Sequence, residues 1–203
     1  MSLQGTANLS VGFTPGLTGG SPITSFGASC TDGAASTVTG TSLTSPITVT
    51  GLTRGVTYTC SVTATNLYGV SQASQSSSAI TIPTVPGVPT GVSATRAVVS
   101  AAVVSFVPPA SNGGSPILSY RATCSSTGAL DVVQTGSASP ITVSGLVITA
   151  AYTCRVVATN AVGDSASSAA TATLPGATVP GAPTALTTTI DLNRVVQLGF
   201  LAP

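Results

Sequence analysis

The chain of 203 residues repeats itself at a fixed interval of 94 positions. Cys30 recurs as Cys124, Cys60 recurs as Cys154, and a Val-Pro-Gly tripeptide recurs at the same interval. Such self-similarity indicates one structural unit copied in tandem. The sequence therefore predicts an array of similar domains rather than one large core. Such arrays usually separate other modules, display them or mediate adhesion.

A two-residue alternation of apolar and polar side chains runs through the repeats. Leu118–Cys124 and Tyr152–Ala158 both alternate in this way, which is typical of strands with one face in a core. Further strands are expected over Val103–Val107, Ile141–Val143 and Ala170–Leu174, separated by Gly- and Ser-rich turns. Because no window has a helical period, the predicted fold class is all-β, and short strands at this spacing favour a β-sandwich.

Ionisable side chains are scarce. Charged residues make up 4% of the chain, His is absent, and the formal net charge is +1. General acid–base catalysis needs groups that titrate near neutral pH, so no enzyme is predicted. The chain has no basic run for nucleic acid and no apolar stretch of the roughly 20 residues that a membrane-spanning helix needs. We therefore expect no cofactor, no nucleic-acid partner and no membrane insertion.

Each repeat carries two cysteines. The favoured interpretation is one disulfide per repeat, Cys30 with Cys60 and Cys124 with Cys154, each stabilising its repeat by roughly 3 to 4 kcal/mol through loop closure. Free buried thiols and a four-thiolate metal site are the alternatives. Zinc ligands usually come in close pairs, which are absent here, so no metal site is expected. Disulfides would indicate an oxidising compartment.

Several stretches together resemble a known family. These are Val88–Val92, Val104–Pro109, Gly113–Ile117 and Val156–Gly163, of which the last three have counterparts in the first repeat. They look like fibronectin type III domains of the bacterial secreted or surface type, and the resemblance covers nearly the whole chain. It implies immunoglobulin-like β-sandwiches in tandem.

The same resemblance implies roles for particular residues. Tyr58 and Tyr152 match the tyrosine corner of the family, in which the phenol oxygen bonds back to the chain near a strand turn. Phe13 and Phe106 stand where the family usually carries a core Trp. The four cysteines map onto the third and sixth strands, which are neighbours within one sheet. Each disulfide would then be a rung inside a sheet.

The resemblance also divides the chain. Residues 1–83 would form a repeat that lacks its first strand, residues 87–175 a complete repeat, and residues 179–203 the first two strands of a third. Proline-bearing linkers predict domains placed end to end with limited bending. Because unpaired edges invite pairing, we expect Pro183–Leu201 to supply the missing edge of a first repeat, in the same array or in a neighbouring chain.

Few side chains are candidates for a binding site. Tyr68, beside a glycine in an expected loop, would offer its ring to a sugar or a peptide, or else pack on its own domain. Asp131 lies in a Leu-Asp-Val tripeptide that some adhesive proteins use for integrins, although chance matches are common. Arg121 and Arg155, on outward positions of neighbouring strands, are interpreted as solvated surface residues, with a small anion patch as the alternative.

The function predicted from these features is a non-catalytic spacer or display array within a larger protein that is secreted or on the cell surface. Its partners would be the neighbouring domains of that protein. An adhesive module that binds a glycan or a protein through inter-strand loops is the alternative. The loops are rich in Gly and Ser and poor in the aromatic and Arg residues that usually anchor interfaces, which favours the spacer.

Overall fold

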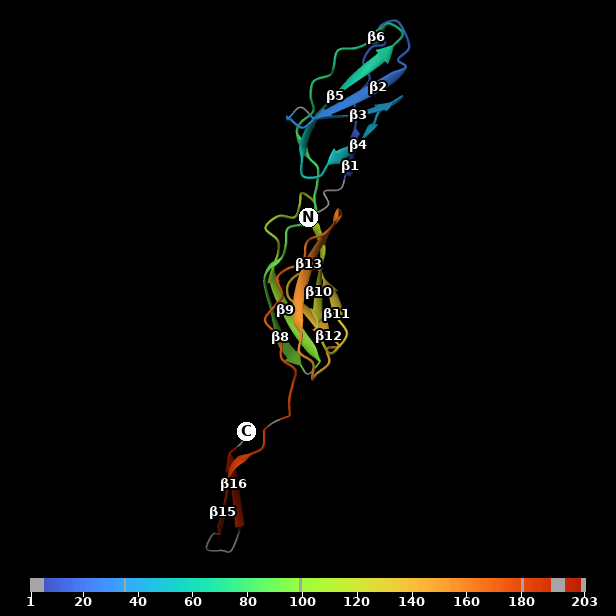
Figure 1. Cartoon of the computed structure of the whole chain (residues 1–203). Helices are drawn as coiled ribbons and strands as arrows, with labels where there is room; N and C mark the ends of the chain where they lie inside the picture. Colours follow the sequence, from blue (N-terminus) through green and yellow to red (C-terminus); the bar gives the residue numbers. More distant parts are fainter. Residues whose placement is uncertain (1–5, 35, 99, 180, 191–195, 202–203) are drawn as a thin grey trace.

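The computed structural model describes the chain apart from residues 1–5, 35, 99, 180, 191–195 and 202–203. Within the described residues every regular element is a strand, so the predicted all-β class is confirmed. Figure 1 shows two β-sandwiches placed end to end, followed by a separate hairpin at the far end of an elongated chain.

The N-terminal sandwich is built from two sheets. One sheet pairs β1 with β4, and the other has the order β3-β2-β5-β6, with β7 also pairing with β5. Its strands are β1 (Thr6–Val11), β2 (Ser25–Thr31), β3 (Thr37–Ser42), β4 (Ile47–Thr53), β5 (Thr57–Asn66), β6 (Gly69–Val70) and β7 (Ile80–Thr81).

The second sandwich has the same plan, except that its smaller sheet contains three strands instead of two. Its sheets have the orders β12-β9-β8 and β11-β10-β13-β14. Its strands are β8 (Thr90–Val98), β9 (Ala101–Val107), β10 (Ile117–Ser125), β11 (Val132–Gly136), β12 (Ile141–Ser144), β13 (Thr153–Asn160) and β14 (Gly163–Asp164). Because β1 is the counterpart of β9, the strand that has no described counterpart in the N-terminal sandwich is β8.

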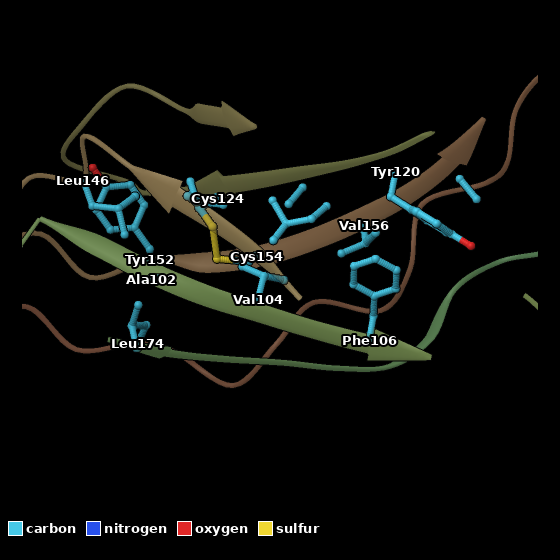
Figure 2. Close-up of a cluster of buried hydrophobic side chains, with 14 residues drawn as sticks. Ala102, Val104, Phe106, Tyr120, Cys124, Leu146, Tyr152, Cys154, Val156 and Leu174 are labelled. Carbon is cyan, nitrogen blue, oxygen red and sulfur yellow. A yellow bond between two sulfur atoms is a disulfide. The ribbon is translucent and has the colours of Figure 1, made fainter. Parts of the chain in front are cut away.

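Each sandwich encloses its own core of side chains that alternate along the strands. In the second core the disulfide lies between two apolar ends, with Leu146 and Tyr152 on one side and Phe106 and Tyr120 on the other (Figure 2). The rings of Phe106 and Tyr120 lie 4.8 Å apart, in the tilted geometry that aromatic pairs favour. Phe13 packs in the same way against Phe26 in the first core, at 4.7 Å.

Two expectations from the alternation are wrong. Leu118 is 64% exposed, because a register shift between Ile117 and Ser119 moves it out of the inward series that begins at Tyr120. The segment Ala170–Leu174 is not a strand; only Leu174 forms a bridge, to Tyr152.

The hairpin of β15 (Thr184–Ile190) and β16 (Val196–Leu201) resembles β8 and β9 in detail. The pairing of β15 shifts register between Thr184 and Thr187, as that of β8 does between Thr90 and Ser93. Within this bulge Ala185 has a φ of 52°, and the equivalent Gly91 has a φ of 58°. The hairpin thus has the geometry of the first two strands of a further sandwich, and its membership of a third repeat stays a prediction.

Candidate functional site

The structure joins Cys30 to Cys60 and Cys124 to Cys154. In both sandwiches the two cysteines are direct partners across adjacent antiparallel strands, β2 with β5 and β10 with β13. Their Cα atoms are 4.0 Å apart in each pair. Each disulfide therefore ties two central strands of one sheet together, as a rung.

The two candidate corner tyrosines occupy equivalent places. The phenol oxygen of Tyr58 accepts the backbone N–H of Thr53 at 3.2 Å, and that of Tyr152 accepts the N–H of Val147 at 3.2 Å. Both rings are buried. Each tyrosine thereby fixes the turn that precedes its own strand, which is a structural role rather than a chemical one.

Sequence reasoning missed a set of hydrogen bonds along β13, which we call the hydroxyl ladder. Ser165, Ser168 and Thr171 each donate a backbone N–H to a β13 carbonyl and accept a β13 N–H through the side-chain hydroxyl. For Ser168 the two bonds with Val156 measure 3.0 and 2.9 Å. Because the hydroxyl replaces the backbone carbonyl as acceptor, the segment advances three residues for every two of β13 and cannot be a regular strand.

A second hydroxyl ladder lies along β5 in the N-terminal sandwich. It uses Ser71, Ser74 and Ser77, whose hydroxyls accept the N–H groups of alternate β5 residues at 2.9 to 3.0 Å. Each of these hydroxyls also donates to the carbonyl of the next residue at 2.9 Å, which fixes its orientation. The signal in the sequence is a hydroxyl residue at every third position, a period that matches neither a strand nor a helix.

The joint between the sandwiches contains a connected set of hydrogen bonds. The linker that crosses it is bound to the second sandwich through two backbone hydrogen bonds. Thr84 donates its N–H to the carbonyl of Gly113 at 2.8 Å, and Gly87 donates to that of Ser111 at 2.9 Å. The linker is thus held in one path. We call the surface that receives it, formed by residues 111–114 and 160–163, the linker socket.

Asn160 completes the linker socket from the end of β13. Its Nδ2 donates to the carbonyls of Thr84 and Asn112, both at 2.8 Å. Its Oδ1 accepts the N–H groups of Val162 at 2.8 Å and Gly163 at 3.1 Å. All four hydrogen-bonding positions of the amide are used, and the residue is 3% exposed.

Gly113 is required where the linker crosses the socket. Its φ is +72°, and a Cβ at this position would overlap the carbonyl oxygens of Thr84 and Val85. Glycine is therefore required for two reasons: the backbone is in the left-handed region, and the linker approaches too closely for a side chain. The side chain of Val85 packs beside Gly163, with Cγ1 3.5 Å from the place a Cβ would take.

Side chains of both sandwiches border the joint. Arg54 of the first sandwich donates to the carbonyl of Pro83 at 3.1 Å. A hollow between the sandwiches is lined by Leu9, Arg54, Ile80 and Ile82 from the first and by Ser115, Ala161 and Val162 from the second. The linker is therefore hydrogen-bonded to both sandwiches rather than forming a free tether.

The candidate binding residues do not form a site. Tyr68 is 82% exposed in the turn between β5 and β6, and Asp131 is exposed in the loop before β11, so the two lie on different sandwiches. Arg121 pairs with Asp164 at 2.7 Å, and Arg155 donates to the carbonyl of Ser168 at 2.7 Å. Each guanidinium group therefore has a partner of its own, and the alternative of an anion patch stays a prediction.

Metal-binding clusters and membrane-spanning helices are both absent from the described residues. No group of three or more His, Cys, Asp or Glu side chains is placed to hold a metal ion there. No helix in that part of the chain is long and apolar enough to cross a bilayer.

Comparisons with known proteins place the fold. Domains A168–A170 of titin match with a TM-score of 0.52 and 21% identity, over 85% of this chain and 59% of that one, so the chain spans about three fifths of the titin segment. A segment of two fibronectin type III domains from chicken tenascin matches over 77% of this chain and 86% of its own, with 20% identity and a TM-score of 0.42. No curated protein matches the sequence.

The model of the fibronectin type III domain matches twice, over residues 1–80 and 87–173. The two matches fall on the two sandwiches, each with its own core, disulfide and corner tyrosine. Domains of this kind are generally structural or adhesive and typically non-catalytic. The chain belongs to the fibronectin type III family and carries two of its domains in tandem.

Proposed function

We propose that the chain is a stiff, non-catalytic spacer that holds other parts of a larger protein at a fixed separation. The observation that carries this proposal is the joint, where Thr84, Gly87 and Asn160 fix the linker on the second sandwich. A flexible tether would leave these backbone groups to water. Fixing them removes rotations about the linker, so that the length of one sandwich adds to that of the next.

The interior of each sandwich supports the same role. A pulling force enters and leaves a domain at its ends and must separate strands before the chain lengthens. The disulfide rung between Cys124 and Cys154 limits how far β10 and β13 can separate, and the pair between Cys30 and Cys60 does the same for β2 and β5. The 30 residues spanned by each rung cannot extend while it is intact.

We further propose that the protein works outside the cell, as a secreted or surface-attached array of bacterial type. Two disulfides are consistent with an oxidising environment. Because only 4% of the residues are charged, few side chains could transfer protons, which supports a role without catalysis.

The stiffness of the joint is testable by NMR relaxation and residual dipolar couplings on the full chain. We expect the two sandwiches to share one alignment tensor and to tumble as one elongated body. The Gly113→Asn variant should uncouple them, because Asn tolerates a positive φ while its side chain would displace the linker from the socket.

The matched control is Gly33→Asn, at a φ of +77° in an exposed turn with nothing within 4 Å of its Cβ position. It should leave the shared tensor unchanged. Independent tensors for the two sandwiches of the native chain would overturn the spacer proposal.

An adhesive role is the second candidate, favoured by exposed apolar side chains at the free end of the N-terminal sandwich. Leu17, Leu67, Tyr68 and Val70 are between 67% and 101% exposed there. Leu130, beside Asp131, is 89% exposed on the other sandwich. A glycan array and a surface-binding assay with native chain, Tyr68→Ala and Asp131→Asn would support this role if either variant lost a signal that the native chain gives.

A further inference from the structure

The N-terminal sandwich carries a copy of the linker socket at its outer end. Asn66, the counterpart of Asn160, donates to the carbonyl of Thr18 at 2.9 Å, as Asn160 does to Asn112. Its Oδ1 accepts the N–H of Tyr68 at 2.9 Å. Gly19, the counterpart of Gly113, has a φ of +64°. The receiving surface is therefore built in the same way in both sandwiches.

No described residue fills this second socket. A hollow lies there, lined by Leu17, Thr18, Gly19, Asn66, Tyr68 and Gly69 among others. Asn66 is half-buried, whereas Asn160 under its linker is 3% exposed. A Cβ on Gly19 would meet Asn66 Nδ2 at an ordinary 3.7 Å, whereas one on Gly113 would strike the linker. The difference between the two sockets is the linker itself.

Within the described part of the chain, the sheet next to this open socket has an edge without a partner strand. In the second sandwich β9 pairs with β12 on one side and with β8, which continues directly from the linker, on the other. In the N-terminal sandwich β1 pairs with β4, and within the described residues no strand lies along its other edge. Among the described residues, the socket therefore holds no linker and the edge of β1 pairs with no strand, whereas the second sandwich has both.

The chain carries a second copy of that segment at its opposite end. Residues 178–181 repeat the Thr-Val-Pro-Gly of residues 84–87, and β15 follows them as β8 follows the linker. The exit from the second sandwich is held as far as Ala177, which donates to the carbonyl of Ile148 at 2.8 Å. Beyond it, Thr178 is exposed and Val179 is 88% exposed.

We propose that this chain associates with itself head to tail. Thr178 and Val179 of one copy enter the open socket of a second copy, and β15 of the first copy adds to the free edge of β1 in the second. Thr178 then takes the place of Thr84, donating to the carbonyl of Gly19 and accepting from Asn66 Nδ2. Val179 packs beside Gly69 as Val85 does beside Gly163.

The exchange of partners costs little. The strand β15 is paired with β16 in a hairpin without a core of its own, and isolated two-stranded hairpins are at best marginally stable. The surfaces that would meet carry exposed apolar side chains, and the nearby Arg96 donates to the carbonyls of Pro175 and Ala150. Leu67 and Tyr68 beside the open socket are 83% and 82% exposed, and Val147 and Ile148 at the exit are 48% and 40% exposed.

The geometry predicts chains of copies rather than closed dimers. The donor segment and the open socket lie at opposite ends of the elongated molecule (Figure 1), so the contact joins two different surfaces. Contacts of this kind continue from copy to copy unless a rotation closes a ring. Association should therefore grow with concentration and lengthen the particle.

Sedimentation velocity on the full chain across a concentration series tests this proposal, with Gly19→Asn as the blocking variant. Asn accepts the positive φ, and its side chain would stand where the entering linker must pass. We expect the native chain to form elongated oligomers and Gly19→Asn to weaken association at least tenfold. Gly33→Asn, the control in an exposed turn away from the socket, should associate like the native chain.

Hydrogen exchange on the same samples gives a second measure that does not depend on a variant. Backbone amides of β1 should gain protection as concentration rises, and a free peptide of residues 178–190 should shift the native chain toward monomers. A native chain that stays monomeric, or association that is equal in Gly19→Asn and the native chain, would overturn the proposal. The spacer role is unaffected by either result, because it depends on the tensor shared within one chain.

Discussion

The two hydroxyl ladders make the same hydrogen bonds in different surroundings. Ser165, Ser168 and Thr171 are between 1% and 7% exposed, whereas Ser71, Ser74 and Ser77 are exposed. The burial follows the presence of β8, which lies against β13 in the second sandwich and has no described counterpart beside β5. An identical list of hydrogen bonds therefore does not imply an identical contribution to stability, because what each bond is worth depends on whether water can replace it.

The largest expected effect is the loss of a disulfide, a feature that both sandwiches have. The disulfides span equal separations of 30 residues, so the loop-closure account assigns them equal losses of roughly 3 to 4 kcal/mol. We expect Cys30→Ala/Cys60→Ala and Cys124→Ala/Cys154→Ala to destabilise their own sandwiches by similar amounts, as measured by hydrogen exchange in denaturant. If only one sandwich were destabilised, native-state packing rather than loop length would determine how much each disulfide stabilises its sandwich.

The next effect separates the ladders. Ser168→Ala leaves the Val156 N–H without its acceptor in a buried place, which should cost about 2 to 3 kcal/mol. Ser74→Ala removes the equivalent acceptor of Val62 in an exposed place, where water replaces it at a cost of about 0.5 kcal/mol. Urea unfolding followed by exchange in each sandwich measures both. Equal losses of stability in the two variants would contradict the claim that burial determines the contribution of each hydrogen bond.

A smaller effect separates the two sockets. Asn160→Ala removes four hydrogen bonds, several of them to groups near the surface that water can reach, so we expect a loss of about 1 to 2 kcal/mol. Asn66→Ala should cost less than half of that, because no described linker depends on it. Thermal unfolding measures both losses of stability. In residual dipolar couplings, Asn160→Ala should give the two sandwiches different alignment tensors, whereas Asn66→Ala should leave them with one.

The smallest effect concerns a feature that the second sandwich has alone. Arg121 and Asp164 form an ion pair with side chains 44% and 43% exposed, and the equivalent positions of the first sandwich are Gly27 and Val70. Solvent screening limits such a pair to about 0.5 kcal/mol. Arg121→Gln should lower the stability of the second sandwich by that amount in low salt and by less in 1 M salt, with the first sandwich as an internal control.

Much of the fold could be predicted because it depends on local pattern and on repetition. Two-residue alternation located β10 and β13, and the interval of 94 positions gave two units with equivalent cysteines. The pattern failed where a bulge interrupts alternation, as at Leu118, and where a side chain replaces a backbone acceptor, as at Ser168. A hydroxyl at every third residue is visible in the sequence, but its meaning requires knowing which strand lies beside it.

The joint could not be predicted for a different reason. Asn66 and Asn160 recur at the same interval as the cysteines, yet an amide side chain in a turn has many uses. Its role in the second sandwich depends on Thr84, which lies 76 positions away. The closeness of Gly113 to the linker is likewise a property of the assembled sandwich rather than of the glycine-rich turn.

The hydroxyl ladders also have a consequence for solubility. An outer strand with unpaired N–H and C=O groups is a template for aggregation, and proteins commonly blunt it with lysine or other charges. This chain has few charges to use. The strands β5 and β13 are central, but the neighbours β6 and β14 on their outer sides are only two residues long. Along the rest of these sides, serine and threonine hydroxyls accept alternate N–H groups with a three-residue step that no incoming strand can match. The outer sides of β5 and β13 are thereby closed to further strands without the use of charge.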